Sequence, residues 1–561
     1  FVLQRTGGNP AHLIDVTRFL RDRELLQVRG GLVVPPPGGL ALLDDVVPKT
    51  AANAALAQID GLGEVEKRIV RMASAIGRNF SRDLLESVSG AELDPKLIGW
   101  AMDSLEGRRV IGPDAGPRGY AFRDDVMRAA AYRTMPEGKR REIHKRIADA
   151  LEARTDLDLS RDAASLAVHR ERAAEWKEAA RWYEISAQVS LKSALNDEAR
   201  HFHSRWEACV SKLSEEERPT PEDTAQMALL KLAALGRRRL PAQTLGQGRH
   251  VATHHSHALG SQAKLVVHFW LGCALAWMGQ TVRARDRLKK VWEHAEDAAM
   301  RCDAAVEMAR TYAYATDRIS AGRWLNRAAE LAKTDPLRAS LVRLFQAALE
   351  TEAGALEEAR LACLEIQATS RKAGLLHIAA MAQNQAACCD LYSRNFERAR
   401  SGFESALQID RSLGNWSLFA SELTHLGQAF LWDERYTEAR HILEKALRFA
   451  RDADDPIAVA EASVHLGAAV ALSADPEEGL ILLEQGSTLA MRVGHREAAL
   501  AATLHLLHIA LVREDTDAIR RYAVTCAEEA REHKTPLFRH ASDALIEQAA
   551  VRDIPDTTRG A

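Results

Sequence analysis

Small side chains recur along the second half of this chain at a fixed spacing that predicts most of its fold. From about residue 265 to residue 530, a small residue is followed by a second one 12 positions later and a third one 7 positions after that. The first two let the helices of a hairpin approach closely, and the third admits the next hairpin. The triplet repeats every 37 to 40 residues, in six strong copies and a weaker seventh: Gly272, Ala284, Val291; Ala309, Ala321, Ala328; Ala347, Ala359, Ile366; Ala387, Ala399, Ala406; Gly427, Ala439, Ala446; Gly467, Gly479, Gly486; and Leu506, Ala518, Thr525. A fixed period of this length indicates an α-helical solenoid.

The first part of the chain shows a different pattern, in which helix and strand signals alternate over short distances. Apolar residues at helical spacing predict helices over residues 10–26, 64–76, 81–88, 95–105 and 137–154. Residues 32–34 are a candidate strand. Two apolar runs, at 110–111 and 120–122, flank a Gly/Pro-containing turn as the strands of a β-hairpin do. Three helices followed by a hairpin are the element order of a winged helix.

The residues that carry the repeat spacing resemble a known family. In residues 423–446, the packing positions of a tetratricopeptide repeat are matched by Leu426, Gly427, Phe430, Tyr436, Ala439, Leu443 and Ala446. The usual unit of that family is about 34 residues, so these repeats resemble a long form whose helices are extended by roughly half a turn or more. The resemblance covers about half of the chain, and it implies that the first helix of each hairpin lines the concave side.

We therefore predict an all-α fold: a right-handed α-α superhelix, or tetratricopeptide-like solenoid, preceded by a small winged-helix-like domain. Two further small-residue triplets, Val168, Ala180, Ala187 and Ala187, Ala199, Trp206, indicate hairpins before the solenoid, and Leu230, Ala242 and Arg249 form a degenerate unit. The predicted organisation is an ATPase-type helical region with a linker (1–45), the winged-helix-like domain (46–135), a helical connector with the first repeat-like hairpins (136–215), the repeat solenoid (216–550) and a disordered tail (551–561).

The N-terminal part carries motifs of a second family. Gly8-Asn9-Pro10 is followed by Ile76-Gly77-Arg78-Asn79-Phe80, by Tyr120-x-Phe122-Arg123, by Ala131-Tyr132 and by Arg140-Arg141-x-x-His144. In this order and spacing, the series resembles the signal-transduction ATPases with numerous domains (STAND), a branch of the AAA+ superfamily that bacteria attach to class III nucleotide cyclases or serine/threonine kinases. The resemblance implies that Gly8, Asn9 and Pro10 form part of a nucleotide-base pocket. It also implies ATP or ADP and Mg²⁺ in a missing N-terminal part that holds the P-loop.

Two features depart from that family. It usually has His after the Phe-Arg pair, where it senses the nucleotide phosphates, and this chain has Asp124. A carboxylate repels a phosphate unless a cation lies between them, which puts nucleotide sensing by Asp124 in doubt. The sequence also contains no G-x-x-x-x-G-K-[ST] and no apolar run ending in paired acids. We expect this chain to be no enzyme and to hold no cofactor, with a nucleotide-binding remnant of Gly8, Asn9, Pro10 and Asp124.

Charge and cysteine content indicate in which cellular compartment the protein works and which classes of partner it attracts. The 75 basic and 78 acidic residues nearly balance, so no global field attracts nucleic acid or an anionic membrane. The seven cysteines show no CxxC spacing, which indicates reduced thiols in a cytoplasmic protein. We expect no apolar run long enough to span a bilayer. The first residue is Phe, with no signal-peptide pattern after it, so we expect the chain to begin inside a longer protein.

Two charged clusters have simpler interpretations than a binding site. A dense histidine cluster comprises His250, His254, His255 and His257. No Cys or acidic ligand lies near it in the sequence, so a solvated loop is preferred and no metal site is predicted. The basic stretch at 139–146 could contact DNA phosphates. Glu137, Glu142 and Asp149 dilute its charge, which favours an exposed helix face and disfavours direct DNA binding.

The remaining candidate surface is the concave wall of the solenoid. Counting from the small-residue anchors places a set of aromatic and polar side chains there: Phe269, Trp277, Arg310, Tyr314, Asn384, Tyr392, Thr424, Gln428 and Trp432. Aromatic residues with polar neighbours suit a groove that takes a protein or peptide partner, or a small ligand. Packing of Trp277, Tyr314, Tyr392 and Trp432 between adjacent hairpins is equally consistent with the sequence.

We interpret the chain as the non-catalytic C-terminal sensor and protein-interaction region of a STAND-type regulator, cyclase-like or kinase-linked in full length. Two alternatives stay open: a free-standing tetratricopeptide scaffold, and a fragment of a LuxR-like transcriptional regulator. We expect the LuxR-like alternative to be the weaker one, because its DNA-binding helix-turn-helix has no counterpart near Pro555-Asp556-Thr557-Thr558.

The lack of a phosphate cradle generates the first prediction. The purified chain should hydrolyse no ATP and should bind it weakly if at all, since Gly8, Asn9 and Pro10 supply only part of a base pocket. A steady-state assay of phosphate release in the presence of Mg²⁺ checks this. Mg²⁺-dependent turnover that a point mutation in the chain abolishes would contradict it.

Overall fold

The protein is described from a computed structural model that divides into two compact units, with the boundary along the chain between Ala234 and Leu235. The structure describes residues 27–29, 32–34, 56, 59–114, 119–123, 125–193, 195–315, 317–413, 416–453, 455–473, 475–532 and 536–551. The predicted helix at 10–26, the nucleotide-binding remnant Gly8, Asn9, Pro10 and Asp124, and the predicted tail beyond Val551 lie outside the described residues.

The first unit contains a short strand pair, followed by helices and a three-stranded sheet. The predicted strand at 32–34 is present as β2 (Leu32–Val34), paired antiparallel with β1 (Gln27–Arg29). The next elements are α4 (Glu64–Ile76), β3 (Asn79–Ser81), α5 (Arg82–Ser89), η2 (Gly90–Glu92), α6 (Pro95–Gly107), β4 (Ile111–Pro113), β5 (Gly119–Phe122) and α7 (Asp125–Arg133). The predicted helices and hairpin are therefore present. Strand β3, too short to show an alternating pattern, adds to the hairpin in the order β3-β5-β4. The winged-helix assignment stays a prediction.

Aromatic rings pack between strands of this sheet, and one ion pair connects it to α7. Phe80 on β3 is buried, with its ring centroid 6.1 Å from that of Tyr120 and 5.8 Å from that of Phe122, both on β5. Arg78 extends the link to α7, where its Nη1 lies 3.0 Å from the Asp125 carboxylate. Phe80, Tyr120 and Phe122 of the STAND-like motif thus pack together, and the Arg78 side chain, 48% exposed, pairs with Asp125 beside them.

Helices continue the first unit after the sheet. They are α8 (Glu137–Glu152), α9 (Leu159–Arg172), α10 (Trp176–Lys192), α11 (Asn196–Val210), η3 (Glu215–Glu217) and α12 (Pro221–Arg237), and α8 to α11 pack consecutively. The two predicted triplets fit this packing, because Val168 is half-buried and the other members are buried: Ala180, Ala187, Ala199 and Trp206. The degenerate triplet does not fit, since Leu230 is buried but Ala242 and Arg249 are exposed.

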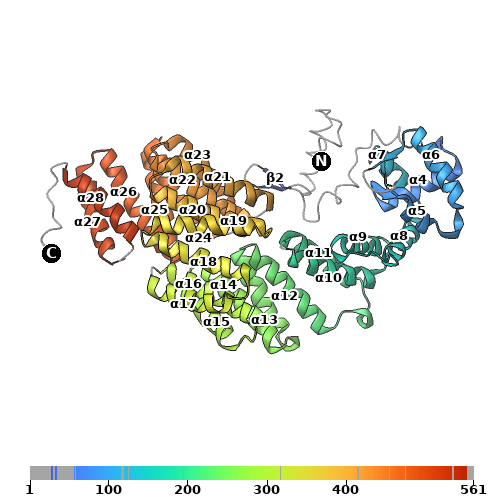
Figure 1. The fold of residues 1–561 in the computed structure, drawn as a ribbon, viewed down its shortest axis with the longest axis horizontal. Helices are drawn as coiled ribbons and strands as arrows, with labels where there is room; N and C mark the ends of the chain where they lie inside the picture. Colours follow the sequence, from blue (N-terminus) through green and yellow to red (C-terminus); the bar gives the residue numbers. More distant parts are fainter. Residues whose placement is uncertain are drawn as a thin grey trace. The chain divides into compact units, whose positions relative to one another are not determined.

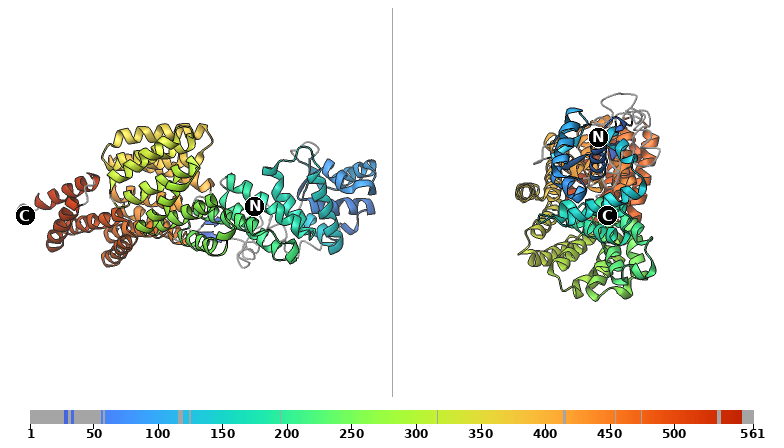
Figure 2. Two further views of the ribbon diagram at one scale, coloured as in Figure 1. Left: turned by 90° about the horizontal axis from the view of Figure 1, so that it is seen from below. Right: turned by 90° about the vertical axis from the view of Figure 1, so that its right-hand side faces the viewer.

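The second unit consists of helices that pack consecutively from α13 to α28, so that helical hairpins stack side by side (Figures 1 and 2). The helices are α13 (Pro241–His254), η4 (Ser256–Ala258), α14 (Ser261–Trp277), α15 (Thr281–His294), α16 (Ala298–Ala313), α17 (Arg318–Ala332), α18 (Pro336–Glu352), α19 (Leu356–Lys372), α20 (Leu376–Tyr392), α21 (Phe396–Leu413), α22 (Trp416–Trp432), α23 (Tyr436–Asp452), α24 (Pro456–Ser473), α25 (Pro476–Arg492), α26 (Arg496–Val512), α27 (Thr516–Glu532) and α28 (Pro536–Val551). This is the predicted tetratricopeptide-like solenoid.

The small-residue triplets lie where the helices of this solenoid touch. Every member of the six strong triplets is buried, whereas Leu506 and Thr525 of the weaker seventh are half-buried. A Cβ added to Gly272 would lie 2.8 Å from the Leu288 side chain, and one added to Gly467 would lie 2.8 Å from the Gly479 carbonyl oxygen. The hairpin helices approach at distances that only small residues allow.

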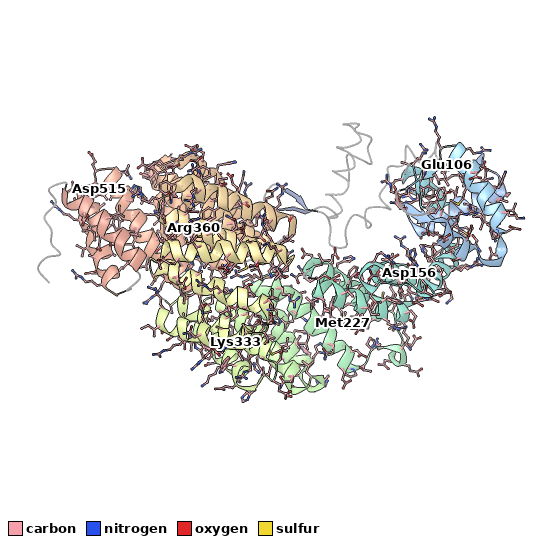
Figure 3. All side chains as sticks on the ribbon, viewed as in Figure 1. Glu106, Asp156, Met227, Lys333, Arg360 and Asp515 are labelled. Atoms are coloured by element: carbon pink, nitrogen blue, oxygen red, sulfur yellow. The ribbon has the colours of Figure 1, made fainter. Side chains whose placement is uncertain are left out.

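Aspartate side chains begin several of these helices. Asp297, Asp335 and Asp475 cap α16, α18 and α25 by accepting hydrogen bonds from backbone N–H groups of the first turn. Asp515, labelled in Figure 3, accepts one from the Ala518 N–H at 3.0 Å at the start of α27. These caps satisfy donors that the helix itself leaves unpaired.

One helix corrects the expectation that no apolar run could span a bilayer. Among the described residues, α24 is long and apolar enough to do so, with a mean hydropathy of 1.4 over its 18 residues. Of that window, 72% is buried inside the protein. The apolar composition therefore has a physical reason in the fold, since α24 is covered by its neighbours α22, α23, α25 and α26.

Two turns that lie far apart in the sequence meet in the solenoid. Gly279, between α14 and α15, has a φ of +75° and faces the Val493 carbonyl, which follows α25. A Cβ on Gly279 would overlap that carbonyl group. His495, two residues after Val493, contacts Tyr314 at the end of α16, with ring centroids 5.7 Å apart. The hairpin α14–α15 is therefore in direct contact with the hairpin α24–α25.

This contact generates a prediction about Gly279. Gly279→Ala should lower the thermal midpoint more than Gly374→Ala, because both positions have positive φ (+75° and +74°) but a Cβ at Gly374 meets nothing within 4 Å. The positive φ should destabilise each variant by about 1–2 kcal/mol, and overlap with Val493 should add roughly 1–3 kcal/mol in Gly279→Ala. Calorimetry of both variants checks this, and equal midpoints would show that the two turns do not touch.

Candidate functional site

The first helices of successive hairpins form the inner face of the solenoid. Helices α14, α16, α18, α20, α22, α24, α26 and α28 each pack on the next in this series, as well as on their hairpin partners. In the described part of the chain, the second helices α15 to α27 do not pack on one another to a comparable extent. An array whose first helices touch while its second helices diverge curves with the first helices on the concave side.

A polar network crosses this inner face from α20 to α24. The His425 ring on α22 lies between two neighbours, with its Nδ1 3.1 Å from Asn384 Oδ1 on α20 and its Nε2 3.6 Å from Glu461 Oε1 on α24. Burial alone would lower the pKa of His425, but Cys388 and Glu461 raise it well above its usual range. Burial alone would raise the pKa of Glu461, but the facing His425 lowers it to about 2. His425 and Glu461 therefore form an ion pair at neutral pH.

A histidine pair continues the network toward α26. His465 Nδ1 on α24 lies 2.9 Å from His505 Nε2 on α26, and both side chains are buried. Burial lowers the pKa of His465 to about 4 and lowers that of His505 well below its usual range. Both rings are therefore neutral near pH 7, and one donates its N–H to the unprotonated nitrogen of the other.

Aromatic and acidic side chains gather where the first helices end. Tyr392 at the end of α20 and Trp432 at the end of α22 have ring centroids 5.6 Å apart. Tyr392 also interacts electrostatically with Glu352, at the end of α18, and with Glu497, in the first turn of α26. Burial, and then the charge of Glu497, raise the pKa of Glu352 to about 8. Aromatic rings beside these carboxyl groups can hold a polar group of a ligand.

The structure brings some of the predicted groove residues onto this face. Asn384 joins the His425 network, Tyr392 lies against Trp432, and Tyr314 lies against His495. The remaining half-buried members, Arg310 and Phe269, have local partners. Arg310 pairs with Glu307 at 3.2 Å and lies over the Phe345 ring, and Phe269 contacts Trp270.

Three other predicted groove residues are buried. Trp277, Thr424 and Gln428 are only 3%, 1% and 7% exposed. The Thr424 hydroxyl donates to the Ala420 carbonyl within its own helix, and the Arg239 guanidinium lies 5.5 Å from the Trp277 ring centroid. The structure places these side chains in packing between helices because each first helix is covered by its neighbours on both sides.

Sequence reasoning missed most of the charged network. His425, Glu461, His465, His495, Glu497 and His505 were not singled out. The signal that could have found some of them is the repeat itself, since Asn384 and His425 are 41 residues apart and His465 and His505 are 40 apart. Polar residues that recur with the repeat period lie on the same face of adjacent hairpins.

The motif residues of the first unit stabilise its fold. The Tyr132 hydroxyl lies 2.8 Å from His144 Nε2, and His144 Nδ1 lies 2.9 Å from His169 Nδ1. In the basic stretch of α8, Lys139 and Arg146 pair with Glu142 at 2.9 Å and 2.6 Å. These pairs compensate much of the positive charge that could have attracted DNA.

The remaining candidate ligands form no site of their own. His250 and His254 stack, with ring centroids 4.7 Å apart. In the part of the chain that the structure covers, no group of three or more His, Cys, Asp or Glu side chains is placed to hold a metal ion. All seven cysteines are free and buried.

Comparison with known proteins assigns no family. No protein-family model and no curated protein matches this chain. Among solved structures, a Rap protein complexed with competence and sporulation factor aligns over 66% of this chain and 99% of its own, at 14% identity and a TM-score of 0.47. A STAND protein with a tetratricopeptide-repeat sensor from Pyrococcus horikoshii aligns over 87% of this chain and 70% of its own, at 14% identity and a TM-score of 0.39. The Cut9–Hcn1 hetero-tetramer of APC/C aligns over 76% of this chain and 98% of its own, at 12% identity and a TM-score of 0.32. Sequence identities and TM-scores this low assign no activity to this chain.

The buried histidine pair generates a prediction about pH. An unfolded histidine titrates near about 6.5, whereas the pKa of folded His465 is about 4. Between these values the unfolded chain binds more protons than the folded chain does. The contribution of this buried histidine to the free energy of unfolding is therefore fully present above pH 6.5 and falls as the pH drops toward 4. Thermal midpoints of the intact chain at several pH values check this decline.

Two matched variants test whether the His465–His505 pair causes this fall in the thermal midpoint at acidic pH. His505→Gln can still hydrogen-bond His465 and removes one titrating ring, so the fall in midpoint between pH 7 and pH 4.5 should be shallower. His441→Gln, at an exposed position on α23, should leave the slope unchanged. Parallel slopes for wild type and His505→Gln would contradict the assignment.

Proposed function

We propose that this chain is the non-catalytic sensor and protein-interaction region of a STAND-type regulator, and that the inner face of its solenoid binds a peptide or protein partner. The observation that carries the proposal is the network on successive first helices, in which Asn384, His425 and Glu461 connect α20, α22 and α24. The aromatic and acidic side chains at the ends of α16, α18, α20 and α22 extend it.

The shape of this network favours an extended partner. It follows several helices in succession, so a ligand that contacts all of it must itself be elongated. An extended peptide offers backbone donors and acceptors at regular intervals, which suit polar side chains that recur from hairpin to hairpin. The half-buried Tyr392 and Trp432 rings supply the kind of aromatic anchor that dominates binding energy at protein interfaces.

The regulatory part of the proposal rests on the first unit. Arg78, Phe80, Tyr132 and His144 belong to the motif series that resembles STAND proteins, and each contacts another element of this unit. The proposal assigns nucleotide hydrolysis, with ATP and Mg²⁺, to a protein segment that holds a P-loop and lies outside this chain. Partner binding on the inner face would be the signal that this segment receives.

Trp432→Ala tests the inner face as a binding site. Peptides selected from a displayed library on the intact chain should bind this variant more weakly by roughly 2 kcal/mol, because a buried aromatic anchor is lost. Titration calorimetry of wild type, Trp432→Ala and Trp100→Ala checks this. Trp100, on α6 of the first unit, is 58% exposed and serves as the matched control, with no expected effect.

Thermal unfolding of the same variants separates binding from packing. The midpoint of Trp432→Ala should stay close to that of wild type. A loss of about 3–5 kcal/mol in stability would mark Trp432 as core packing between hairpins. That result, or equal peptide affinity in both tryptophan variants, would show that the inner face near Trp432 is not part of the binding site.

A further inference from the structure

A second candidate site lies among α13, α14 and α15, apart from the network on α20 to α26. These three helices line a cavity of about 440 Å³, and they lie next to one another in the second unit (Figure 1). Helices α13 and α15 are second helices of successive hairpins, and the first helix α14 lies between them in the chain. The volume is within the range of about 300–1,000 Å³ that is usual for small-molecule sites.

Three leucines supply an apolar surface in this cavity. Leu271 and Leu275 are one helical turn apart on α14, and Leu245 faces them from α13. All three are buried, at 5%, 7% and 8% exposure. Leucine side chains in this position offer contact to an apolar body and no hydrogen bond.

Four cations surround the leucines. Arg283, Arg287 and Lys290 follow one face of α15, and Arg249 approaches from α13. Asp286 is the one acidic side chain in the lining. Arg283 donates a hydrogen bond to Gln280 Oε1 at 3.1 Å, and Arg287 Nη1 lies 3.0 Å from His268 Nδ1.

In the described part of the chain, these four cations form no ion pair. Among the described residues, no carboxylate lies within 4.0 Å of the charged nitrogens of Arg249, Arg283, Arg287 or Lys290. The adjacent Lys289, by contrast, pairs with Glu293 at 3.6 Å. Burial, followed by the charges of Arg287 and Lys290, lowers the pKa of His268. With four cations and one carboxylate in its lining, the cavity carries a net positive charge beside apolar side chains.

We propose that this cavity binds a small amphipathic anion, an apolar body that bears a carboxylate or a phosphate. The apolar body would contact Leu245, Leu271 and Leu275. The anionic head would accept charge-assisted hydrogen bonds from Arg283, Arg287 and Lys290, which are stronger than neutral ones. The site is separate from the inner face and does not depend on the function proposed for that face.

Titration of defined anions into the intact chain tests this proposal. Dodecanoate and dodecyl phosphate, each below its critical micelle concentration, should bind saturably with one molecule per chain. Dodecyltrimethylammonium, which has the same apolar body and the opposite charge, should not bind. The two anions also distinguish a carboxylate head from a phosphate head by their relative affinities.

Neighbouring lysines provide matched variants for the same titration. Lys290→Glu should weaken anion binding roughly tenfold or more, since a charge-assisted hydrogen bond is lost and a repulsive charge replaces it. Lys289→Glu changes the same charge on the same helix outside the lining and should bind as wild type does. Both positions are exposed, so the fold should tolerate either change, and circular dichroism of both variants checks this.

Several outcomes would overturn the proposal. They are the absence of saturable binding of either anion, equal binding of the cationic amphiphile, and equal weakening by the two lysine variants. Binding of anionic vesicles or of an acidic peptide without binding of the monomeric anions would also overturn it and would assign the cavity to a macromolecular partner.

Discussion

The close approach of two helix backbones within each hairpin limits everything else that the solenoid can do. In the hairpin α24–α25, Gly467 and Gly486 lie against the facing backbone at Leu483 and Val464, where an added Cβ would come within 2.5 Å and 2.7 Å of the nearest atoms. A methyl group has no room there, so the two helices are held at one separation. The other hairpins bury small residues at the same phase, so corresponding positions of successive hairpins lie at the contacts between helices.

The packing of each first helix on the next decides how polar groups on the inner face are satisfied. A first helix is covered by its second helix and by the first helices on both sides, so its polar side chains find partners one repeat away. His425 interacts with Asn384 on one side and Glu461 on the other, and His465 interacts with His505. Pairing between repeats lets a narrow inner face carry ionisable groups that would be costly to bury singly. It also connects neighbouring hairpins, so a partner that binds one of them contacts a linked network.

Side chains on the second helices pair within their own helix or with the next hairpin, as Arg360 does with Glu357 and Asp390 and Arg400 does with Asp433. On α15, Lys289 reaches Glu293 in its own helix, whereas Arg283, Arg287 and Lys290 face the cavity beside Leu271 and Leu275. In the first unit, Lys139 and Arg146 both pair with Glu142 on α8. Helices α15 and α8 are both rich in basic residues, so the difference in their ion pairing depends on local geometry and not on composition.

The sequence by itself determined the repeat, the helices and the small contact positions, because these depend on spacing along one chain. Six triplets in register predicted which residues are buried, and short amphipathic segments predicted α4, α5, α6 and the hairpin of β4 and β5. Strand β3 escaped because three residues show no periodicity. Only the tertiary structure decided which inner-face residues are accessible. Counting from an anchor gives the face of a helix, but burial of Trp277, Thr424 and Gln428 depends on how closely the next hairpin packs. Contacts such as Gly279 with Val493 depend on the curvature accumulated over five hairpins, which no local spacing encodes.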